Sequence, residues 1–262
     1  MFVQNISPTL LEVGPIEIRY YGLLFASAVM FGFLVLSRTF RESNIDEELA
    51  DKLSTYTVIS LIIGARLVHC FFYNPDYYFA HPEEIIMIWR GGIASHGGAL
   101  GMLFAVWLFC KNYGYKFEEI ADKIAISITA APIMIRLGNF FNSEIVGKPT
   151  DVAWATTFVR YDNIPRHPSQ LYEAFLGVIV LAIMWNLYWK YHKEKAHGYF
   201  MYLFISLYFL QRFLVEFAKE YQTLDPSTSP LTMGQYLSLP FLIFGLVMFW
   251  KRSQESKNLE RT

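Results

Sequence analysis

Long apolar stretches divide the chain, and short charged segments separate them. Seven stretches of about 20 residues carry almost no charge, and this is the length that an α-helix needs to cross a bilayer. They lie at residues 18–37, 53–73, 91–110, 124–143, 168–189, 198–218 and 233–250. The pattern predicts an all-α integral membrane protein with seven transmembrane helices, forming a single polytopic membrane domain over residues 1–262.

The Lys and Arg residues between these stretches indicate how the chain is oriented. If the N-terminus lies outside, the cytoplasmic segments hold 13 Lys or Arg residues and the outer segments hold 5. Because these residues are enriched in cytoplasmic loops, the N-terminus is predicted outside and the C-terminus in the cytoplasm. The longest outer segment, residues 144–167, contains Pro149 and Pro165. We expect it to form a small external head.

The overall composition agrees with a membrane protein and narrows the classes of function. Hydrophobic residues make up 54% of the chain and charged residues 17%, against about 25% charged in soluble domains. The net charge of −1 and the lack of a basic tract argue against a nucleic-acid partner. Cys70 and Cys110 lie far apart without metal-ligand spacing, so neither a metal site nor a disulfide is expected.

Polar residues inside an apolar stretch are costly and therefore mark sites of interest. In "IRLGNFFNSEIVG", residues 135–147, Arg136 and Asn139 are three residues apart and share a helix face. Asn142 continues that face toward the outer end. We expect the face to look into the helix bundle or into a wet cavity, because lipid would not tolerate it.

A second polar stripe lies in the sixth stretch, where Tyr208, Arg212 and Glu216 follow at intervals of four residues. Glu216 could simply neutralise Arg212. Arg212 and Arg136 are nevertheless expected at the same depth, where two cations repel unless an anion lies between them. A lipid phosphate is a suitable anion, because planar guanidinium groups bind phosphate oxygens well.

Three further residues are candidates with structural alternatives. His96 lies in the glycine-rich "GGIASHGGALG" at the same outer depth, but it cannot form a dyad with its helical neighbour Ser95. Arg66, three residues before His69, could support the site or only pair within the fold. Tyr21 could contact the site or serve as an interfacial aromatic residue.

The set of motifs resembles the prolipoprotein diacylglyceryl transferase family. The family signature reads Gly-Arg-x-Gly-Asn-Phe-x-Asn-x-Glu-x-x-Gly, and the chain departs from it at Ile135, in place of the first glycine. The matching positions are Arg136, Gly138, Asn139, Phe140, Asn142, Glu144 and Gly147. Other similar blocks are "YYGL" at 20–23, "GARL" at 64–67, "GGIASHGG" at 91–98, "RHPSQLYE" at 166–173, "RFLVEF" at 212–217 and "MGQ" at 233–235.

The resemblance implies a multi-pass enzyme of the bacterial inner membrane, with the N-terminus in the periplasm and the active site toward that side. The implied reaction moves the diacylglyceryl group of phosphatidylglycerol to the thiol of a lipobox cysteine in a prolipoprotein signal peptide. A thioether forms and glycerol phosphate leaves. The implied partners are phosphatidylglycerol, the signal peptide and membrane lipids, and no cofactor or metal is implied.

Roles for the candidates follow from this chemistry. Arg136 and Arg212 are expected to stabilise charge on the departing phosphate, and His96 is the first candidate for the base that takes the thiol proton. Glu144, or a thiolate stabilised by arginine, stays open as an alternative. The expected substrate-binding residues are Tyr21, Asn139, Asn142, Glu144, Gly147, Tyr208, Glu216 and Arg66.

Two other classes of function can be compared with this one on the same residues. A transporter or lipid-binding protein could hold an anionic headgroup with the same arginines and perform no chemistry. An intramembrane serine protease fits poorly, because neither Ser95 nor Ser143 lies in a Gly-x-Ser-Gly setting.

Overall fold

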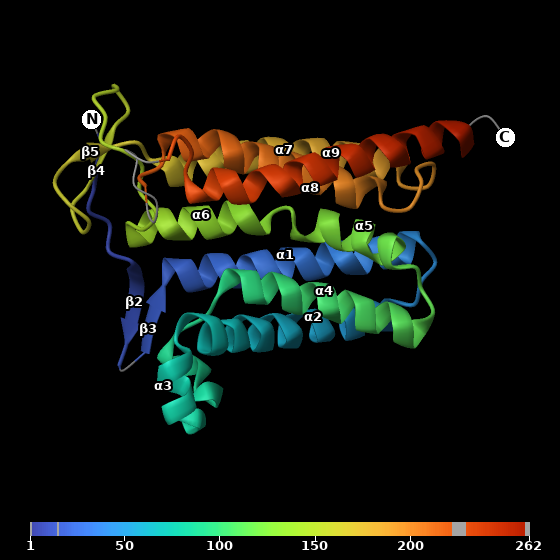
Figure 1. Ribbon diagram of the computed structural model, residues 1–262, viewed down its shortest axis with the longest axis horizontal. Helices are drawn as coiled ribbons and strands as arrows, with labels where there is room; N and C mark the ends of the chain where they lie inside the picture. The colour runs from blue at the N-terminus through green and yellow to red at the C-terminus, as the bar shows by residue number, and fades with distance from the viewer. Residues whose placement is uncertain (1, 15, 222–228, 260–262) are drawn as a thin grey trace. The chain divides into compact units, whose positions relative to one another are not determined.

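The computed structural model describes residues 2–14, 16–221 and 229–259, and they are mostly helical (Figure 1). The helices are α1 Tyr20–Glu42, α2 Glu47–Val68, η1 His69–Tyr73, α3 Pro75–Ala80, η2 Pro82–Ile86, η3 Ile88–Arg90, α4 Ser95–Tyr113, α5 Phe117–Ile128, α6 Ala131–Asn142, α7 Ser169–Tyr191, α8 Tyr199–Val215, η4 Glu216–Ala218 and α9 Met233–Leu259. The strands are β1 Phe2–Gln4, β2 Thr9–Val13, β3 Ile16–Arg19, β4 Thr156–Phe158 and β5 Pro165–Arg166.

Within the described residues, six helical segments are long and apolar enough to cross a membrane. They are Tyr20–Glu42, Glu47–Tyr73, Phe117–Asn142, Ser169–Tyr191, Tyr199–Ala218 and Met233–Leu259. Helix α4 covers most of the third stretch predicted from sequence but is not among them, because its first turns are polar and rich in glycine. The membrane class of the fold is thus supported, while the count of seven spans stays a prediction.

The predicted span at 124–143 is two helices rather than one. Helix α5 ends at Ile128, and α6 starts at Ala131 with Pro132 in its first turn. A proline has no N–H group and is tolerated in the first turn of a helix but not in its interior. Thr129 and Ala130 form the break and are both buried, which is where non-helical backbone can lie at membrane depth.

The chain divides into two compact units. Unit 1 comprises Met1–Val35 and Asp122–Thr262, and unit 2 comprises Leu36–Ala121. In unit 1, α7 lies beside α6 and α8, and α8 lies beside α9 (Figure 1). The buried core of this unit is built from apolar side chains, among them Val35, Ile126, Met184, Tyr188 and Phe200.

Asp122 fixes the start of α8 in unit 1. Its two carboxylate oxygens accept hydrogen bonds from the backbone nitrogens of Gly198 and Met201, both at 2.7 Å. The first N–H groups of a helix have no partner within the helix, so a carboxylate at that point satisfies them and complements the helix dipole. The capping residue comes from α5 and therefore ties α5 to α8.

In unit 2, α2 and α4 pack together through small residues (Figure 1). A Cβ atom at Gly97 would clash with the backbone oxygen of Gly64, and one at Gly101 would clash with that of Ser60. Glycine at these positions lets the two helix backbones approach closely, as is common between helices in membranes.

Two small sheets belong to unit 1. Strands β2 and β3 form an antiparallel hairpin. Strand β1 pairs in parallel with β4, which pairs antiparallel with β5. The 144–167 segment folds without a helix, as its prolines predicted, but the N-terminal strand that joins it was not expected from the sequence.

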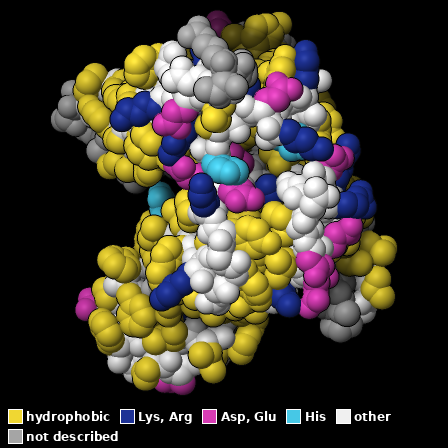
Figure 2. All heavy atoms as spheres, turned by 90° about the vertical axis from the view of Figure 1, so that its right-hand side faces the viewer, with side chains coloured by type: hydrophobic (Ala, Val, Ile, Leu, Met, Phe, Trp, Pro, Cys, Tyr) yellow, Lys and Arg dark blue, Asp and Glu magenta, His cyan; other side chains and the backbone are white. Residues whose placement is uncertain are grey.

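Charged side chains gather at one end of unit 1, where α7 ends, α8 starts and α9 finishes. Lys190, Lys193 and Lys251 are exposed there, and Figure 2 shows this end with hydrophobic side chains on its flanks. Helix α9 exposes Phe241, Phe244 and other large apolar side chains along its length. Such surfaces suit a helix in contact with lipid.

Candidate functional site

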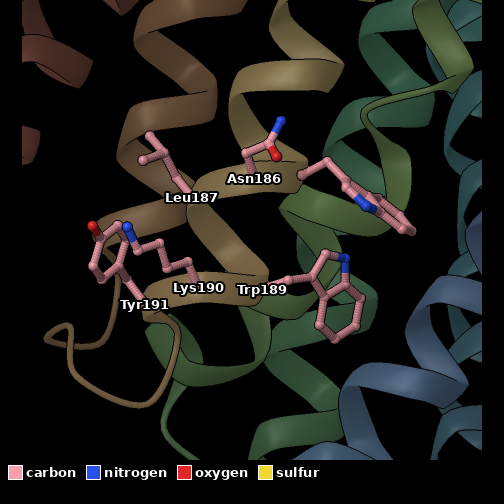
Figure 3. A pocket seen from close by; sticks show the side chains of 6 residues that line it. Asn186, Leu187, Trp189, Lys190 and Tyr191 are labelled. Atoms are coloured by element: carbon pink, nitrogen blue, oxygen red, sulfur yellow. The ribbon is translucent and has the colours of Figure 1, made fainter.

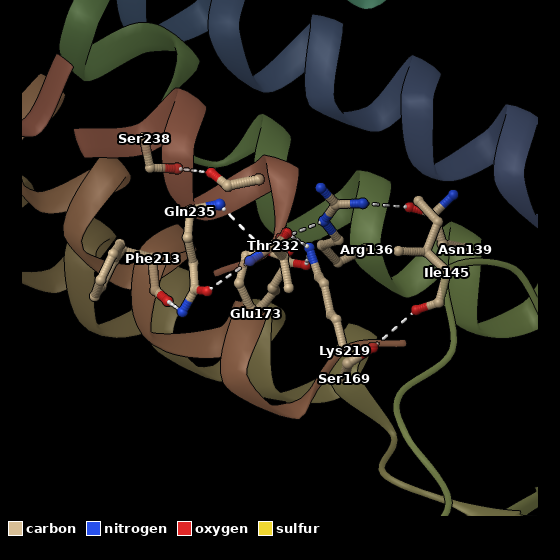
Figure 4. Close-up of polar contacts among 12 residues, drawn as sticks. Arg136, Asn139, Ile145, Ser169, Glu173, Phe213, Lys219, Thr232, Gln235 and Ser238 are labelled. Carbon is tan, nitrogen blue, oxygen red and sulfur yellow. Dashed lines mark hydrogen bonds and ion pairs between the residues drawn. The ribbon is translucent and has the colours of Figure 1, made fainter. Parts of the chain in front are cut away.

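An ion pair joins α6 to α7, one turn after the start of α7 at Ser169. The Nε atom of Arg136 lies 2.6 Å from Oε2 of Glu173, and the two side chains are 13% and 8% exposed (Figure 4). The sequence predicted that Arg136 faces the interior, and its burial confirms this. The anion beside it is a carboxylate of the protein, so Arg136 by itself does not require an external anion for charge balance. An anion shared with Arg212 stays a prediction.

Lys219 connects this pair to a second carboxylate. Its Nζ atom lies 2.6 Å from Oε1 of Glu173 and 2.9 Å from Oε1 of Glu216. The hydroxyl of Thr232 donates a hydrogen bond of 2.8 Å to the other oxygen of Glu216. Positive and negative groups thus alternate along a buried series of four side chains (Figure 4). This series is called here the charge network, and its members are Arg136, Glu173, Lys219 and Glu216.

The signature turn after α6 holds a carboxylate beside the charge network. Asn139 accepts a hydrogen bond of 3.1 Å from Arg136 and donates one of 3.0 Å to Oε2 of Glu144. Asn142 donates a hydrogen bond of 3.2 Å to Oε1 of the same residue. Arg136, Asn139 and Asn142 therefore lie in one hydrogen-bonded group, in which the two asparagines share Glu144 and Arg136 is joined to it through Asn139.

Strained backbone shapes this turn. Ser143 and Ile145 have φ angles of 58° and 56°, a conformation that is unusual for a β-branched residue. The side chain of Gln170 donates to the backbone oxygen of Glu144 at 2.6 Å, and Ser169 donates to that of Ile145 at 2.8 Å. These bonds from the start of α7 hold the strained turn, and such strain is found at functional sites.

Gly147 lies where three segments meet. A Cβ atom there would approach the backbone oxygens of His167 and Ala218 to 2.5 Å and 2.6 Å. Its own N–H group donates to His167. Only glycine fits this position, which gives the last residue of the signature a packing role.

Gly138 allows α1 to cross α6 next to the signature. A Cβ atom at Gly138 would lie 2.6 Å from Cδ2 and 3.3 Å from Cα of Tyr21, and Tyr20 stacks on Phe141 beside it. The close approach places Tyr21 against the helix that carries Arg136.

We expect Gly138→Ala to push Tyr21 away from α6 and to lower the free energy of unfolding by about 1–3 kcal/mol, the usual cost of overpacking. Gly22→Ala is the matched control, because a Cβ atom at Gly22 meets nothing within 4 Å. Thermal unfolding in detergent would measure both variants. Equal midpoints for the two would contradict the prediction.

Arg212 differs from Arg136 in its surroundings. In the described part of the chain, the side chain of Arg212 makes no hydrogen bond or ion pair with another residue, although it is half-buried. Glu216 forms its direct ion pair with Lys219, and the charge of Arg212, one helical turn earlier, also acts on Glu216. The alternative that Glu216 compensates Arg212 stays a prediction. Tyr208, one turn earlier, packs against Phe204 and Phe209.

The remaining predicted residues belong to unit 2. Among the described residues, His96 in the first turn of α4 has no hydrogen-bond partner and is exposed. Arg66 donates to the backbone oxygens of Glu84, Ile85, Gly91 and Gly92 at 2.5–3.0 Å. This geometry favours the structural alternative for Arg66, which holds the 84–92 segment in place.

Arg166 ties the segment after the signature to the end of α8. Its guanidinium donates to Oδ2 of Asp162 at 2.9 and 2.6 Å, to the backbone oxygen of Gly147 at 3.0 Å and to Glu220 at 2.5 Å. The hydrogen bonds from Arg166 hold the pKa of Asp162 below its ordinary value.

We expect this tie to weaken in acid. Because the folded-state pKa of Asp162 is the lower one, the ion pair stabilises the fold above the ordinary aspartate pKa of about 4 and is lost as the pH falls through the folded value. Asp162→Asn should therefore reduce stability at pH 7 and make little difference at pH 2. Proteolysis of the 144–167 segment at the two pH values, with a pepsin-type protease in acid, measures this. An equal effect of the variant at both would contradict it.

A cavity of about 600 Å³ lies at the other end of α7, lined by Trp185, Asn186, Leu187, Trp189, Lys190 and Tyr191 (Figure 3). Glu173 is the fifth residue of this helix, which starts at Ser169. The rise of 1.5 Å per residue places the cavity about 20 Å along the helix from it. The cavity is therefore separate from the charge network.

Sequence reasoning missed several members of the site. Glu173 lies within the block "RHPSQLYE" and Lys219 just beyond the sixth apolar stretch, and neither was among the residues predicted to form the site. Gly234 of "MGQ" leaves space for the carboxylate of Glu216, because a Cβ atom at this position would clash with that carboxylate. The recurrence of Glu and Lys near the ends of apolar stretches was the one available signal.

Comparison with known proteins agrees with these motifs. The sequence model of prolipoprotein diacylglyceryl transferase matches residues 8–251. The phosphatidylglycerol–prolipoprotein diacylglyceryl transferase of Tolumonas auensis is 41% identical over 258 residues, which cover 97% of this chain and 99% of the relative. The enzyme of the same name from Chloroherpeton thalassium is 40% identical over 259 residues, which cover 98% and 96%. The chain belongs to the prolipoprotein diacylglyceryl transferase family.

Proposed function

We propose that this protein transfers the diacylglyceryl group of phosphatidylglycerol to the lipobox cysteine of a prolipoprotein. The bond between the glycerol carbon and the phosphate ester oxygen breaks, a carbon–sulfur bond forms, and glycerol phosphate leaves with the electron pair. Family membership and the names of the relatives support this activity.

The observation that carries the proposal is the state of Arg212. Its half-buried side chain makes no hydrogen bond or direct ion pair in the described residues, and the more distant charge of Glu216, one helical turn later, acts on it. A partly buried charge requires compensation, and a phosphate group supplies it, because two of its oxygens can accept parallel hydrogen bonds from a planar guanidinium.

Arg136 can share the same phosphate. A guanidinium has five N–H donors, and Glu173 and Asn139 engage its Nε and Nη1 atoms. The other donors remain for oxygens on which charge develops as the bond breaks. Preorganised donors of this kind stabilise a transition state without reorganising.

The thiol must lose its proton to become the nucleophile. His96 is our candidate for the base, because its side chain makes no hydrogen bond within the described chain and a histidine is the side chain that most often takes a proton in general base catalysis. Glu144 remains the alternative. Asn139 and Asn142 are proposed to contact the headgroup, and Tyr21 and Tyr208 the lipid or the peptide.

We further propose α4 as the seventh span. Its 19 residues rise about 28 Å, close to the 30 Å thickness of the hydrocarbon core, and its glycines pack on α2. With seven spans, the Lys and Arg distribution places the N-terminus and the 144–167 head in the periplasm. The site then faces the periplasmic side of the inner membrane, where signal peptides emerge.

The test is reconstitution with phosphatidylglycerol and a lipobox peptide, followed by mass spectrometry of the peptide. A mass gain of one diacylglyceryl group with release of glycerol phosphate is the expected result. A preparation that binds phosphatidylglycerol but leaves the peptide unmodified would contradict the proposal and leave a lipid-binding or transport protein. A Cys→Ser peptide is the matched control, because it lacks the thiol.

A further inference from the structure

We propose that Lys219 is a positioning residue for this reaction, which keeps Glu173 and Glu216 together and thereby sets the orientation of Arg136. The inference rests on the proposed function and concerns a residue that lies outside the family signature. Lys219 does not touch the reacting atoms. It acts through Glu173, which Arg136 contacts directly.

The geometry places the ammonium group of Lys219 between two carboxylates. Nζ lies within 2.9 Å of one oxygen from Glu173 and one from Glu216, and its side chain is 6% exposed. The second oxygen of Glu173 contacts Arg136. Any movement of Glu173 would therefore carry the guanidinium with it.

The backbone of Lys219 is fixed as well. It forms an antiparallel bridge with Gly147 of the signature turn, and the neighbouring Ala218 accepts a hydrogen bond of 2.9 Å from Lys148. Lys219 thus joins the signature turn to the carboxylates by its main chain and by its side chain at once.

Charge balance explains why a cation is needed at this point. Without Lys219, the two buried carboxylates would face each other with direct compensation only for Glu173, from Arg136. Glu216 would keep a more distant compensation, from Arg212. An uncompensated buried charge is strongly unfavourable. The carboxylate of Glu216 cannot move away from that of Glu173, because Gly234 lies against it. Thr232 also donates a hydrogen bond to the Glu216 oxygen that does not contact Lys219.

The experiment is a double-mutant cycle in kcat/KM with phosphatidylglycerol and the lipobox peptide, using Lys219→Met and Glu216→Gln. We expect Lys219→Met to lower kcat/KM roughly 10- to 100-fold in the wild-type background, as coupled buried groups do. In the Glu216→Gln background one negative charge is already gone, so the same substitution should cost less than about 3-fold. Lys219→Arg should keep most of the activity.

Two more readouts separate positioning from general damage. The activity of Lys219→Met should recover in part at lower pH, where one of the two carboxylates takes up a proton. Lys148→Met is the matched control, because Lys148 contacts the backbone oxygen of Phe217 and not a carboxylate. It should behave as the wild type at every pH.

The outcomes are distinct. Wild-type activity in Lys219→Met, or an equal loss in both backgrounds, overturns the positioning role. If Lys219→Met does not fold, the double variant compared with Glu216→Gln alone still decides the question, since a loss above 10-fold there overturns the role. Absence of transfer by the wild-type protein contradicts the proposed function instead.

Discussion

Replacing Arg212 with alanine is expected to lower kcat/KM for diacylglyceryl transfer by about 100- to 1,000-fold, the usual effect of removing a donor that stabilises developing charge. The change should cost less than about 1 kcal/mol of unfolding free energy, because Arg212 has no ion pair to lose in the described chain. Transfer to a lipobox peptide and thermal unfolding in detergent measure the two quantities.

Arg136→Ala is the variant with which the transfer activity and the stability of Arg212→Ala should be compared. It should reduce transfer to a similar degree but also destabilise the fold, because Glu173 loses its partner. Arg19→Ala is the control, since that arginine pairs with Glu17 at an exposed position. Wild-type transfer by Arg212→Ala would rule out its role in binding the phosphate.

Glu173→Ala is expected to have the largest effect on stability. It would leave Arg136 and Lys219 facing each other without the carboxylate that both contact. Removing one partner of a buried ion pair costs roughly 3–5 kcal/mol, and transfer should be lost with the orientation of Arg136. Thermal unfolding and kcat/KM would be measured on the same preparation.

Glu220→Gln is the matched control for Glu173→Ala. Its carboxylate also binds an arginine, Arg166, but it is 37% exposed, and such pairs contribute up to about 1 kcal/mol. If Glu173→Ala were no more destabilising than Glu220→Gln, the charge network would not hold the helices together. Glu173→Gln should be intermediate in stability, because it keeps the shape of the side chain.

Local spacing made part of the site predictable. Arg136 and Asn139 share a helix face by their separation alone, and Glu144 follows them closely enough to be held by the same turn. The membrane class followed from the length of the apolar stretches. The break at Pro132 could also have been predicted, because a proline interrupts the hydrogen bonds of a helix.

Contacts between distant segments were out of reach. The pairing of Arg136 with Glu173, and of both carboxylates with Lys219, depends on how α6, α7 and α8 pack. The equal depth of Arg136 and Arg212 in the membrane suggested that both need the same anion. Depth alone does not say which carboxylate of the protein lies next to each arginine. The four backbone acceptors of Arg66 come from a loop whose path is set by packing.

The pairing of β1 with β4 has a consequence for how the protein is made. Gln4 pairs with Phe158, and its side chain, fully buried, donates to the backbone oxygen of Phe140. Strand β1 is synthesised first, and its partner β4 follows about 150 residues later in the sequence. At ordinary rates of synthesis this separation corresponds to roughly 8–30 s. The sheet of β1, β4 and β5 is completed only after α1 to α6 have been synthesised, so the signature turn acquires its final support late in biogenesis.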